Sequence, residues 1–225
     1  MRTRLSITGL TTLIASAALL ADTSTHAGVG THYDYQGGGH CSFTTPRHVM
    51  TAAMNATDYQ GSAACGGLVS VTNTDNDLSV VVRIDDECPE CAPGDIDLDR
   101  RAFVAIAQSV TGRIPIRWHY LPNDQDGTLK LHFKEGSSQW WTAVQVRNHR
   151  YPIVQLAYRP AGRGAYQPLS REPYNYFIAH SGMGHGPYDF RLTDFTGHTV
   201  ELHGVTLQPG ADVSPKQTVE SDPVP

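Results

Sequence analysis

Apolar positions between residues 28 and 120 come in short runs separated by turn-forming residues. The runs at 68–72 and 78–84 are strand-like, and clusters of glycine and aspartate interrupt them. One segment, residues 100–109, instead carries apolar residues on one helical face, and Asp99 stands where an N-cap residue belongs. Many short strands with a single helix predict a compact β-barrel rather than a parallel α/β sheet.

Residues 128–208 show a period-two pattern and no helical pattern. Val144 and Val146 alternate with polar neighbours, another run follows at 153–158, and two later runs flank a turn at 196–197. Evenly spaced short strands of this kind predict a β-sandwich.

The boundary between these two regions falls at residues 121–127, a segment rich in turn formers between two strand-like runs. We therefore predict a first domain at 28–120, a linker at 121–127 and a second domain at 128–208. Residues 209–225 contain proline, serine and acidic residues with almost no large apolar side chain, so they predict a disordered tail.

The first 27 residues have the pattern of a cleaved signal peptide. Arg2 and Arg4 precede an apolar run at 7–20, and small residues at Thr25 and Ala27 suit a signal peptidase. The run is shorter than the roughly 20 residues of a membrane-spanning helix, and no later segment replaces it. We expect a secreted, extracellular protein that does not bind membranes.

The charge of the chain is acidic. The formal net charge is -5, and removal of residues 1–27 leaves 15 basic and 21 acidic side chains, so the mature charge is -6. Nucleic acid is therefore not an expected partner, because phosphate backbones bind basic surfaces.

All four cysteines, Cys41, Cys65, Cys88 and Cys91, lie in the first half of the chain. In an exported protein they predict two disulfides, and the pairing stays open because four cysteines allow three connectivities. Cys88 and Cys91 have the spacing of half a zinc site, but a second close pair is missing. We therefore expect no metal.

Acidic residues crowd into fifteen positions of the first domain: Asp85, Asp86, Asp95, Asp97 and Asp99. Asp97 lies between Ile96 and Leu98, so we expect it at the rim of the barrel, partly desolvated and with a raised pKa. Capping or turn roles are the simpler explanation for Asp85, Asp95 and Asp99.

Hydrolysis of a glycosidic bond with inversion needs a second carboxylate, roughly 6.5–9.5 Å from the acid, to activate a water molecule. With Asp97 as the acid, the candidates for the base are Asp34, Asp58 and Asp86.

Two adjacent tryptophans, Trp140 and Trp141, begin the second domain, with Lys134 just upstream. Exposed aromatic faces stack on sugar rings. Strand parity alone groups Trp140 with the buried Val144 and exposes Trp141, whereas a loop or bulge before the strand would let both face outward.

Residues 134–149 closely resemble the second domain of bacterial expansins. The first domain agrees with the same family through residues 28–33, 53–59, 86–91 and 95–98. The resemblance extends from about residue 28 to residue 207, and both domains match in the family's order.

This resemblance implies a mainly β protein, with a six-stranded double-psi β-barrel followed by an immunoglobulin-like carbohydrate-binding β-sandwich. It also implies a monomer without cofactor, whose partners are cellulose and other plant cell-wall glucans. Proteins of this family loosen wall networks by disrupting noncovalent contacts between glucans, without hydrolysis.

The resemblance also assigns site residues. Asp97 matches the aspartate on which loosening depends, and Asp86 and Thr31 match polar groove residues. The aromatic platform is matched by Trp140, Trp141 and Tyr174, with Lys134 as the basic residue beside it. We therefore expect both tryptophans on the surface.

Two positions depart from related proteins. In inverting endoglucanases on this barrel, the base lies four residues after the equivalent of Thr31. This chain has Tyr35 at that position. Asp34 lies one residue earlier, and on a strand that offset would point its side chain to the opposite face. Cys88 stands where many bacterial relatives have a groove tyrosine.

The alternatives to an expansin are an inverting β-1,4-glucanase, a peptidoglycan transglycosylase on the same barrel, and an adhesion module without loosening activity.

Overall fold

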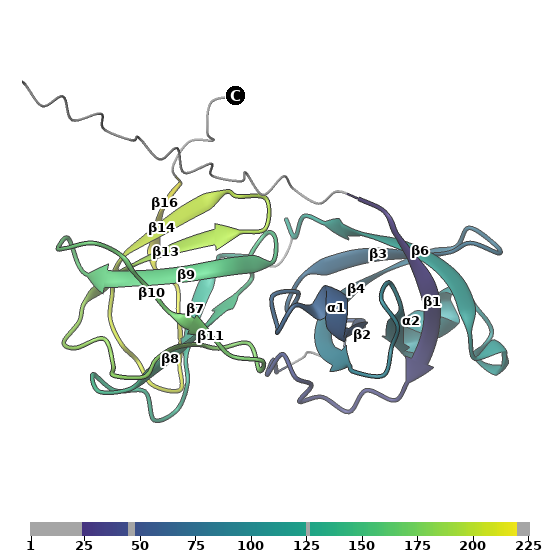
Figure 1. The fold of residues 1–225 in the computed structure, drawn as a ribbon, viewed down its shortest axis with the longest axis horizontal. Coiled ribbons are helices and arrows are strands. Elements are labelled where there is room, and N and C mark those ends of the chain that lie inside the picture. The colour runs from purple at the N-terminus through teal and green to yellow at the C-terminus, as the bar shows by residue number, and fades with distance from the viewer. Residues whose placement is uncertain (1–23, 45–47, 125–126, 220–225) are drawn as a thin grey trace, which may run out of the picture.

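The computed structural model describes residues 24–44, 48–124 and 127–219, which form two β-domains side by side (Figure 1). The first domain ends with β6 and the second begins with β7. The elements in chain order are β1 His26–Tyr33, β2 Thr51–Asn55, α1 Ala56–Tyr59, β3 Leu68–Asn73, β4 Ser79–Cys88, β5 Ile96–Asp99, α2 Arg100–Ile106, a 3₁₀ turn Ser109–Thr111, β6 Ile114–Leu121, β7 Lys130–Phe133, β8 Thr142–Arg147, β9 Ile153–Pro160, β10 Gln167–Pro168, β11 Ser170–Arg171, β12 Phe177–Ala179, β13 Tyr188–Asp194, β14 Thr199–Val205, β15 Asp212–Val213 and β16 Lys216–Val219.

Six strands close the first domain into a barrel in the order β1-β5-β2-β4-β3-β6, as predicted. The pairs β1–β5 and β2–β4 are parallel and the other pairs are antiparallel. Alternate residues of these strands point inward, so that Val69, Val71, Ile114, Ile116 and Trp118 are all buried in one core.

The predicted helix is present as α2. The Asp99 carboxylate accepts hydrogen bonds from the backbone N–H groups of Arg101 at 2.7 Å and Ala102 at 3.2 Å, which is the expected N-cap. The helix ends at Ile106, earlier than the pattern predicted. The single turn α1 was not predicted, since four residues carry no measurable periodicity.

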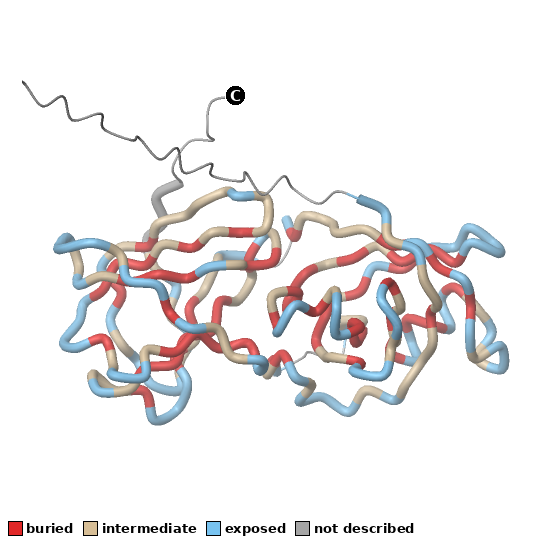
Figure 2. The backbone as a smooth tube through the Cα atoms, in the orientation of Figure 1, coloured by how far each residue is buried: buried red, intermediate tan, exposed pale blue. Residues whose placement is uncertain are grey.

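The second domain is a sandwich of two five-stranded sheets, ordered β10-β9-β13-β14-β16 and β11-β12-β8-β7-β15. A separate core lies between them, with Phe133, Val144, Phe177, Phe190 and Leu202 among its buried residues. Figure 2 shows buried residues along the strands of both domains.

The prediction of a disordered tail at 209–225 is wrong for the part that the structure describes. β15 pairs with β7, and β16 pairs with β14 along Val200–His203. Asp212 also accepts hydrogen bonds from His132 and Arg147, each at 2.8 Å. Strand pairing and the ionic hydrogen bonds of Asp212 hold this segment in place. The prediction of disorder rested on the lack of large apolar side chains, and neither of these interactions needs them. Residues 220–225 lie outside the described part.

The barrel begins earlier than the boundary predicted after Ala27. β1 already includes His26 and Ala27, which pair with Trp118 and Arg117. The His26 ring also stacks on Trp118, with the ring centroids 3.9 Å apart. The predicted end of the signal peptide therefore falls inside a barrel strand; residues 1–23 lie outside the described part.

Both predicted disulfides are present, and they join Cys41 to Cys65 and Cys88 to Cys91. Within the described residues, no group of three or more potential metal ligands comes together. No helix of that part is long and apolar enough to cross a bilayer.

Candidate functional site

Three of the predicted site residues form one row across four neighbouring barrel strands. Thr31 of β1 pairs with Asp97 of β5, Asp97 pairs with Ala53 of β2, and Ala53 pairs with Asp86 of β4. Residues that pair across strands share a face of the sheet. Because neighbouring strands lie about 4.8 Å apart, the backbones at Asp97 and Asp86 are roughly 10 Å apart. The small side chain of Ala53 lies between them.

Asp97 is half-buried, as the sequence predicted. The Thr31 hydroxyl donates a hydrogen bond to its carboxylate at 2.5 Å. Burial raises the pKa of Asp97, with smaller contributions from the negative charges of Glu90 and Asp86, and the hydrogen bond from Thr31 partly opposes this. The raised pKa confirms the expectation from the flanking apolar residues.

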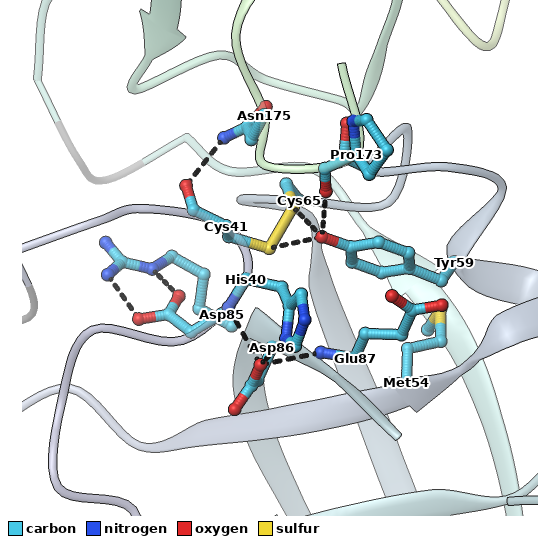
Figure 3. Close-up of a disulfide and its surroundings, with 12 residues drawn as sticks. His40, Cys41, Met54, Tyr59, Cys65, Asp85, Asp86, Glu87, Pro173 and Asn175 are labelled. Carbon is cyan, nitrogen blue, oxygen red and sulfur yellow. Dashed lines mark hydrogen bonds and ion pairs between the residues drawn. A yellow bond between two sulfur atoms is a disulfide. The ribbon is translucent and has the colours of Figure 1, made fainter. Parts of the chain in front are cut away.

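Asp86 is held by the loop that follows β1 (Figure 3). One carboxylate oxygen accepts hydrogen bonds from the backbone N–H groups of His40 at 2.8 Å and Glu87 at 2.9 Å, and the His40 Nδ1 atom lies 2.9 Å from it. The loop approaches closely because Gly39 has no side chain: a Cβ there would lie 2.5 Å from the Asp85 carbonyl oxygen. Sequence reasoning missed His40, whose only signal was the adjacent run of glycines.

Tyr33 is a second residue near this row that the sequence analysis did not single out. It lies two positions after Thr31 on β1 and therefore on the same face. Burial raises the pKa of its hydroxyl, and the nearby charges of Asp86 and Asp97 add to the effect. The two-residue spacing from Thr31 was the signal that could have found it.

Two of the three candidate bases are engaged elsewhere. Asp34 forms a two-pronged ion pair with Arg100, at 2.6 and 3.1 Å, and this exposed pairing lowers the pKa of the Asp34 carboxyl. Asp58 accepts hydrogen bonds from the Asn55 side chain at 2.6 Å and from the Gly94 backbone at 2.9 Å, so it braces the barrel loops.

The other acidic residues of the cluster have structural roles. Asp95 accepts a hydrogen bond from the Val29 backbone at 2.7 Å, and Asp99 caps α2. Asp85 was expected in a turn but lies in β4, where it is fully buried and paired with Arg83 at 2.6 Å. Pairing with an arginine compensates the cost of burying this carboxylate.

The two tryptophans lie in a tight turn before β8, so the strand-parity argument does not apply to them. The backbone N–H of Ser138 donates to the Trp141 carbonyl at 2.6 Å and closes the turn. Trp140 is 73% exposed, as the family resemblance implied. Trp141 is half-buried because it packs on Ala143 and Ile178, so only part of its ring faces solvent.

Tyr174 and Lys134 complete the group of predicted platform residues, and both contact Tyr176. Tyr174 is 37% exposed, and the centroid of its ring lies 6.0 Å from that of Tyr176. The Lys134 ammonium lies 4.9 Å from the centre of the Tyr176 ring. Tyr176 itself is buried in the cluster under Trp141. It supports the platform, and no sequence pattern distinguished it.

Comparison with known proteins now places this site in a family. A protein-family model described as lytic transglycolase matches residues 50–118, which is most of the barrel. Over 182 residues the chain is 32% identical to Expansin-YoaJ of Bacillus subtilis, covering 79% of this chain and 75% of that protein. The chain belongs to the expansin family. Its two-domain architecture is therefore that of an expansin.

Solved expansin structures confirm the architecture. An aspartate-to-asparagine variant of the Clavibacter michiganensis expansin in complex with cellohexaose matches with a TM-score of 0.77 and 33% identity, over 86% of this chain and 96% of that one. The apo form of the same expansin matches with a TM-score of 0.76, 33% identity and the same coverage. Because the match spans both domains, it confirms the predicted double-psi β-barrel and the immunoglobulin-like sandwich.

Proposed function

We propose that this expansin is an exported protein that binds cellulose and related plant cell-wall glucans and loosens the wall without hydrolysing it. The observation that carries the proposal is the row Thr31–Asp97–Ala53–Asp86, with its three polar side chains, together with an exposed aromatic turn in the second domain. Such a combination offers two different interactions to a polysaccharide. Export is supported by the pattern of residues 1–27 and by two disulfides, which persist in oxidising compartments.

In this proposal the platform anchors the protein. Trp140 and Tyr174 are exposed and Trp141 is partly exposed, and a flat glucan surface stacks on these rings through its C–H groups while its hydroxyls stay hydrated. Stacking of this kind has little directionality, so the platform tolerates sliding along the surface.

The groove then competes for the hydrogen bonds of a neighbouring glucan chain. Asp97, as an ionised carboxylate, accepts hydrogen bonds from sugar hydroxyls, and Asp86 and Thr31 extend the polar row. A single hydrogen bond contributes only roughly 0.5–1.5 kcal/mol net in water, so several must act along one chain to separate it from its neighbours. A row across four strands suits that requirement.

The positions of the carboxylates support a function without hydrolysis. An inverting glucanase needs a base that is free to activate water. Asp34 is paired with Arg100 and Asp58 is bound to Asn55 and Gly94, and these interactions disfavour both residues in that role. Asp86 is the remaining candidate, and three N–H groups surround one of its oxygens.

The match to the lytic transglycolase model supports a second candidate, cleavage of peptidoglycan by the barrel, which needs one acid only. The aromatic turn of the second domain favours a flat glucan surface instead. Incubation with purified peptidoglycan separates the two, since a transglycosylase releases soluble fragments and the proposed protein releases none.

One paired experiment tests the main proposal. Purified mature protein is incubated with cellulose and with soluble β-glucans while reducing ends are assayed, and the extension of heat-inactivated plant wall is recorded under constant load. We expect extension without reducing ends. Reducing ends that increase in proportion to the protein added would instead identify a glucanase.

A further inference from the structure

The disulfide between Cys41 and Cys65 lies where the barrel meets the sandwich (Figure 3). Both cysteines are buried, with exposures of 0% and 2%. Cys41 belongs to the loop between β1 and β2, which contains no helix or strand in its described residues. Cys65 belongs to the segment that connects α1 to β3.

On the sandwich side, the disulfide region holds the turn 172–176, which carries Tyr174. The Cys41 carbonyl accepts hydrogen bonds from two side-chain amides of the sandwich, Asn175 at 3.1 Å and Gln145 at 2.9 Å. Both amides are buried, so breaking these bonds would leave polar groups unsatisfied.

The Cys65 half of the disulfide is linked to the same turn. The Tyr59 hydroxyl lies 3.3 Å from the Cys65 sulfur and donates to the Pro173 carbonyl at 3.0 Å. Ser62, three residues before Cys65, donates to the Glu172 carbonyl at 2.7 Å. The turn is therefore bound to the barrel through three of its five residues, counting Asn175.

On the barrel side, the same loop reaches the groove. The Cys41 N–H donates to the Asp85 carbonyl at 3.1 Å, and its neighbour His40 contacts Asp86 through both its backbone and its ring. One short segment, residues 39–41, thus touches a groove aspartate at one end and the turn of Tyr174 at the other.

We infer that the Cys41–Cys65 disulfide is a positioning element that fixes the platform turn relative to the groove, so that both engage the same glucan surface in a defined geometry. This inference rests on the proposed function and names a residue pair that serves it without touching the polysaccharide. Two linked sites act together only when their spacing is compatible with simultaneous contact.

The competing explanation is that the disulfide only adds stability to the barrel. The second disulfide provides the matched control, because Cys88 and Cys91 are three residues apart and lie in the same domain, at the end of β4. The variants are therefore Cys41→Ser/Cys65→Ser and Cys88→Ser/Cys91→Ser. The Cys41–Cys65 disulfide spans 24 residues and the Cys88–Cys91 disulfide spans three, so removal of the first should lower the free energy of unfolding more. The two double variants must therefore be compared well below their melting temperatures.

A third variant tests the junction without changing a disulfide. Asn175 has a φ of 62°, a conformation that glycine adopts readily, so Asn175→Gly removes the amide donor to Cys41 and preserves the turn. This variant distinguishes lost positioning from lost folding.

The measurement is amide hydrogen exchange of residues 172–176, with wall extension and cellulose adsorption recorded on the same samples. The Glu172 and Asn175 N–H groups are hydrogen-bonded within the turn and should exchange slowly. We expect on the order of tenfold faster exchange in Cys41→Ser/Cys65→Ser, a smaller increase in Asn175→Gly, and no change in Cys88→Ser/Cys91→Ser. Extension should fall in the first two variants, while adsorption stays within about twofold.

The outcomes separate this inference from the proposed function. Unchanged exchange at 172–176 in Cys41→Ser/Cys65→Ser overturns the inference, and so does equal acceleration in the control. Faster exchange confined to the junction variants, in a protein that neither adsorbs to cellulose nor extends wall, supports the structural coupling and overturns the proposed function instead.

Discussion

The groove and the platform are built in opposite ways. The residues proposed for the groove lie on three of four neighbouring strands of a closed barrel, where strand register fixes Thr31, Asp97 and Asp86. The platform residues lie in turns outside the strands, where Trp140 is mostly exposed and Tyr174 depends on the junction with the barrel. The groove has charge and directional hydrogen bonds, and the platform has flat apolar surface.

This difference indicates a division of labour. Hydrogen bonds discriminate by geometry, and strands of a closed barrel hold that geometry to a fraction of an ångström. Stacking tolerates displacement and gains its free energy from buried area. The groove is therefore the element expected to act on a glucan chain, and the platform is the element expected to hold the protein on the surface.

The largest expected effect comes from Asp97→Asn. The amide has the shape of the carboxylate but no charge, so it is a weaker acceptor for sugar hydroxyls. We expect wall extension to fall more than about tenfold while adsorption to cellulose stays within twofold. Creep assays and depletion binding on the same preparation give both values. A comparable loss of adsorption would contradict the division of labour.

Acid titration should separate the two regions next. Asp97 is the groove acid whose pKa burial raises, whereas the platform tryptophans do not titrate. As the pH falls below this raised pKa, the ionised fraction drops about tenfold per pH unit, and extension should drop with it, from a pH above the ordinary aspartate value of about 3.9. Adsorption should remain constant.

The raised pKa of Asp97 also determines how its contribution to the free energy of unfolding changes with pH. Burial disfavours the ionised form of Asp97 in the folded state, so its contribution to the free energy of unfolding decreases as the pH rises through the window between the ordinary and the raised pKa. Extension that increases with acidification through this window would indicate that the protonated form of Asp97 is the active one.

A smaller loss, confined to the platform, is expected from Trp140→Ala. Because this ring is 73% exposed, its removal should leave the melting temperature unchanged and weaken adsorption by about tenfold, through lost stacking area. Trp141→Ala is the informative comparison, since Trp141 packs on Ala143 and Ile178 and its loss should lower stability as well. Unchanged adsorption in Trp140→Ala would remove this residue from the platform.

The local pattern of residue types along the sequence was sufficient to predict much of the fold and part of the candidate site. The alternation of apolar residues predicted both domains, and the residue before the helical segment predicted the Asp99 cap. The apolar neighbours of Asp97 predicted its raised pKa. Each of these properties is decided by residues within a few positions of one another.

The remainder depends on pairing between distant segments. The row from Thr31 to Asp86 exists because of strand register across the barrel, and Tyr176 supports the platform from the turn that precedes β12. β16 forms because β14 offers a partner edge, although its own composition predicts disorder. Family resemblance supplied the groove and platform residues, but not their supports, His40 and Tyr176.

The smallest expected effect comes from Asp34→Asn. This substitution tests whether the groove contains a hydrolytic base. Asp34 is the carboxylate nearest in sequence to the position of an endoglucanase base, but both its oxygens bind Arg100 at the exposed start of α2. If the groove acts without a hydrolytic base, this substitution should change neither wall extension nor the absence of reducing ends. Arg100→Gln, which frees Asp34 from its partner, should be equally silent. Reducing ends that the wild type releases and that Asp34→Asn abolishes would identify Asp34 as a base and make the groove an active site.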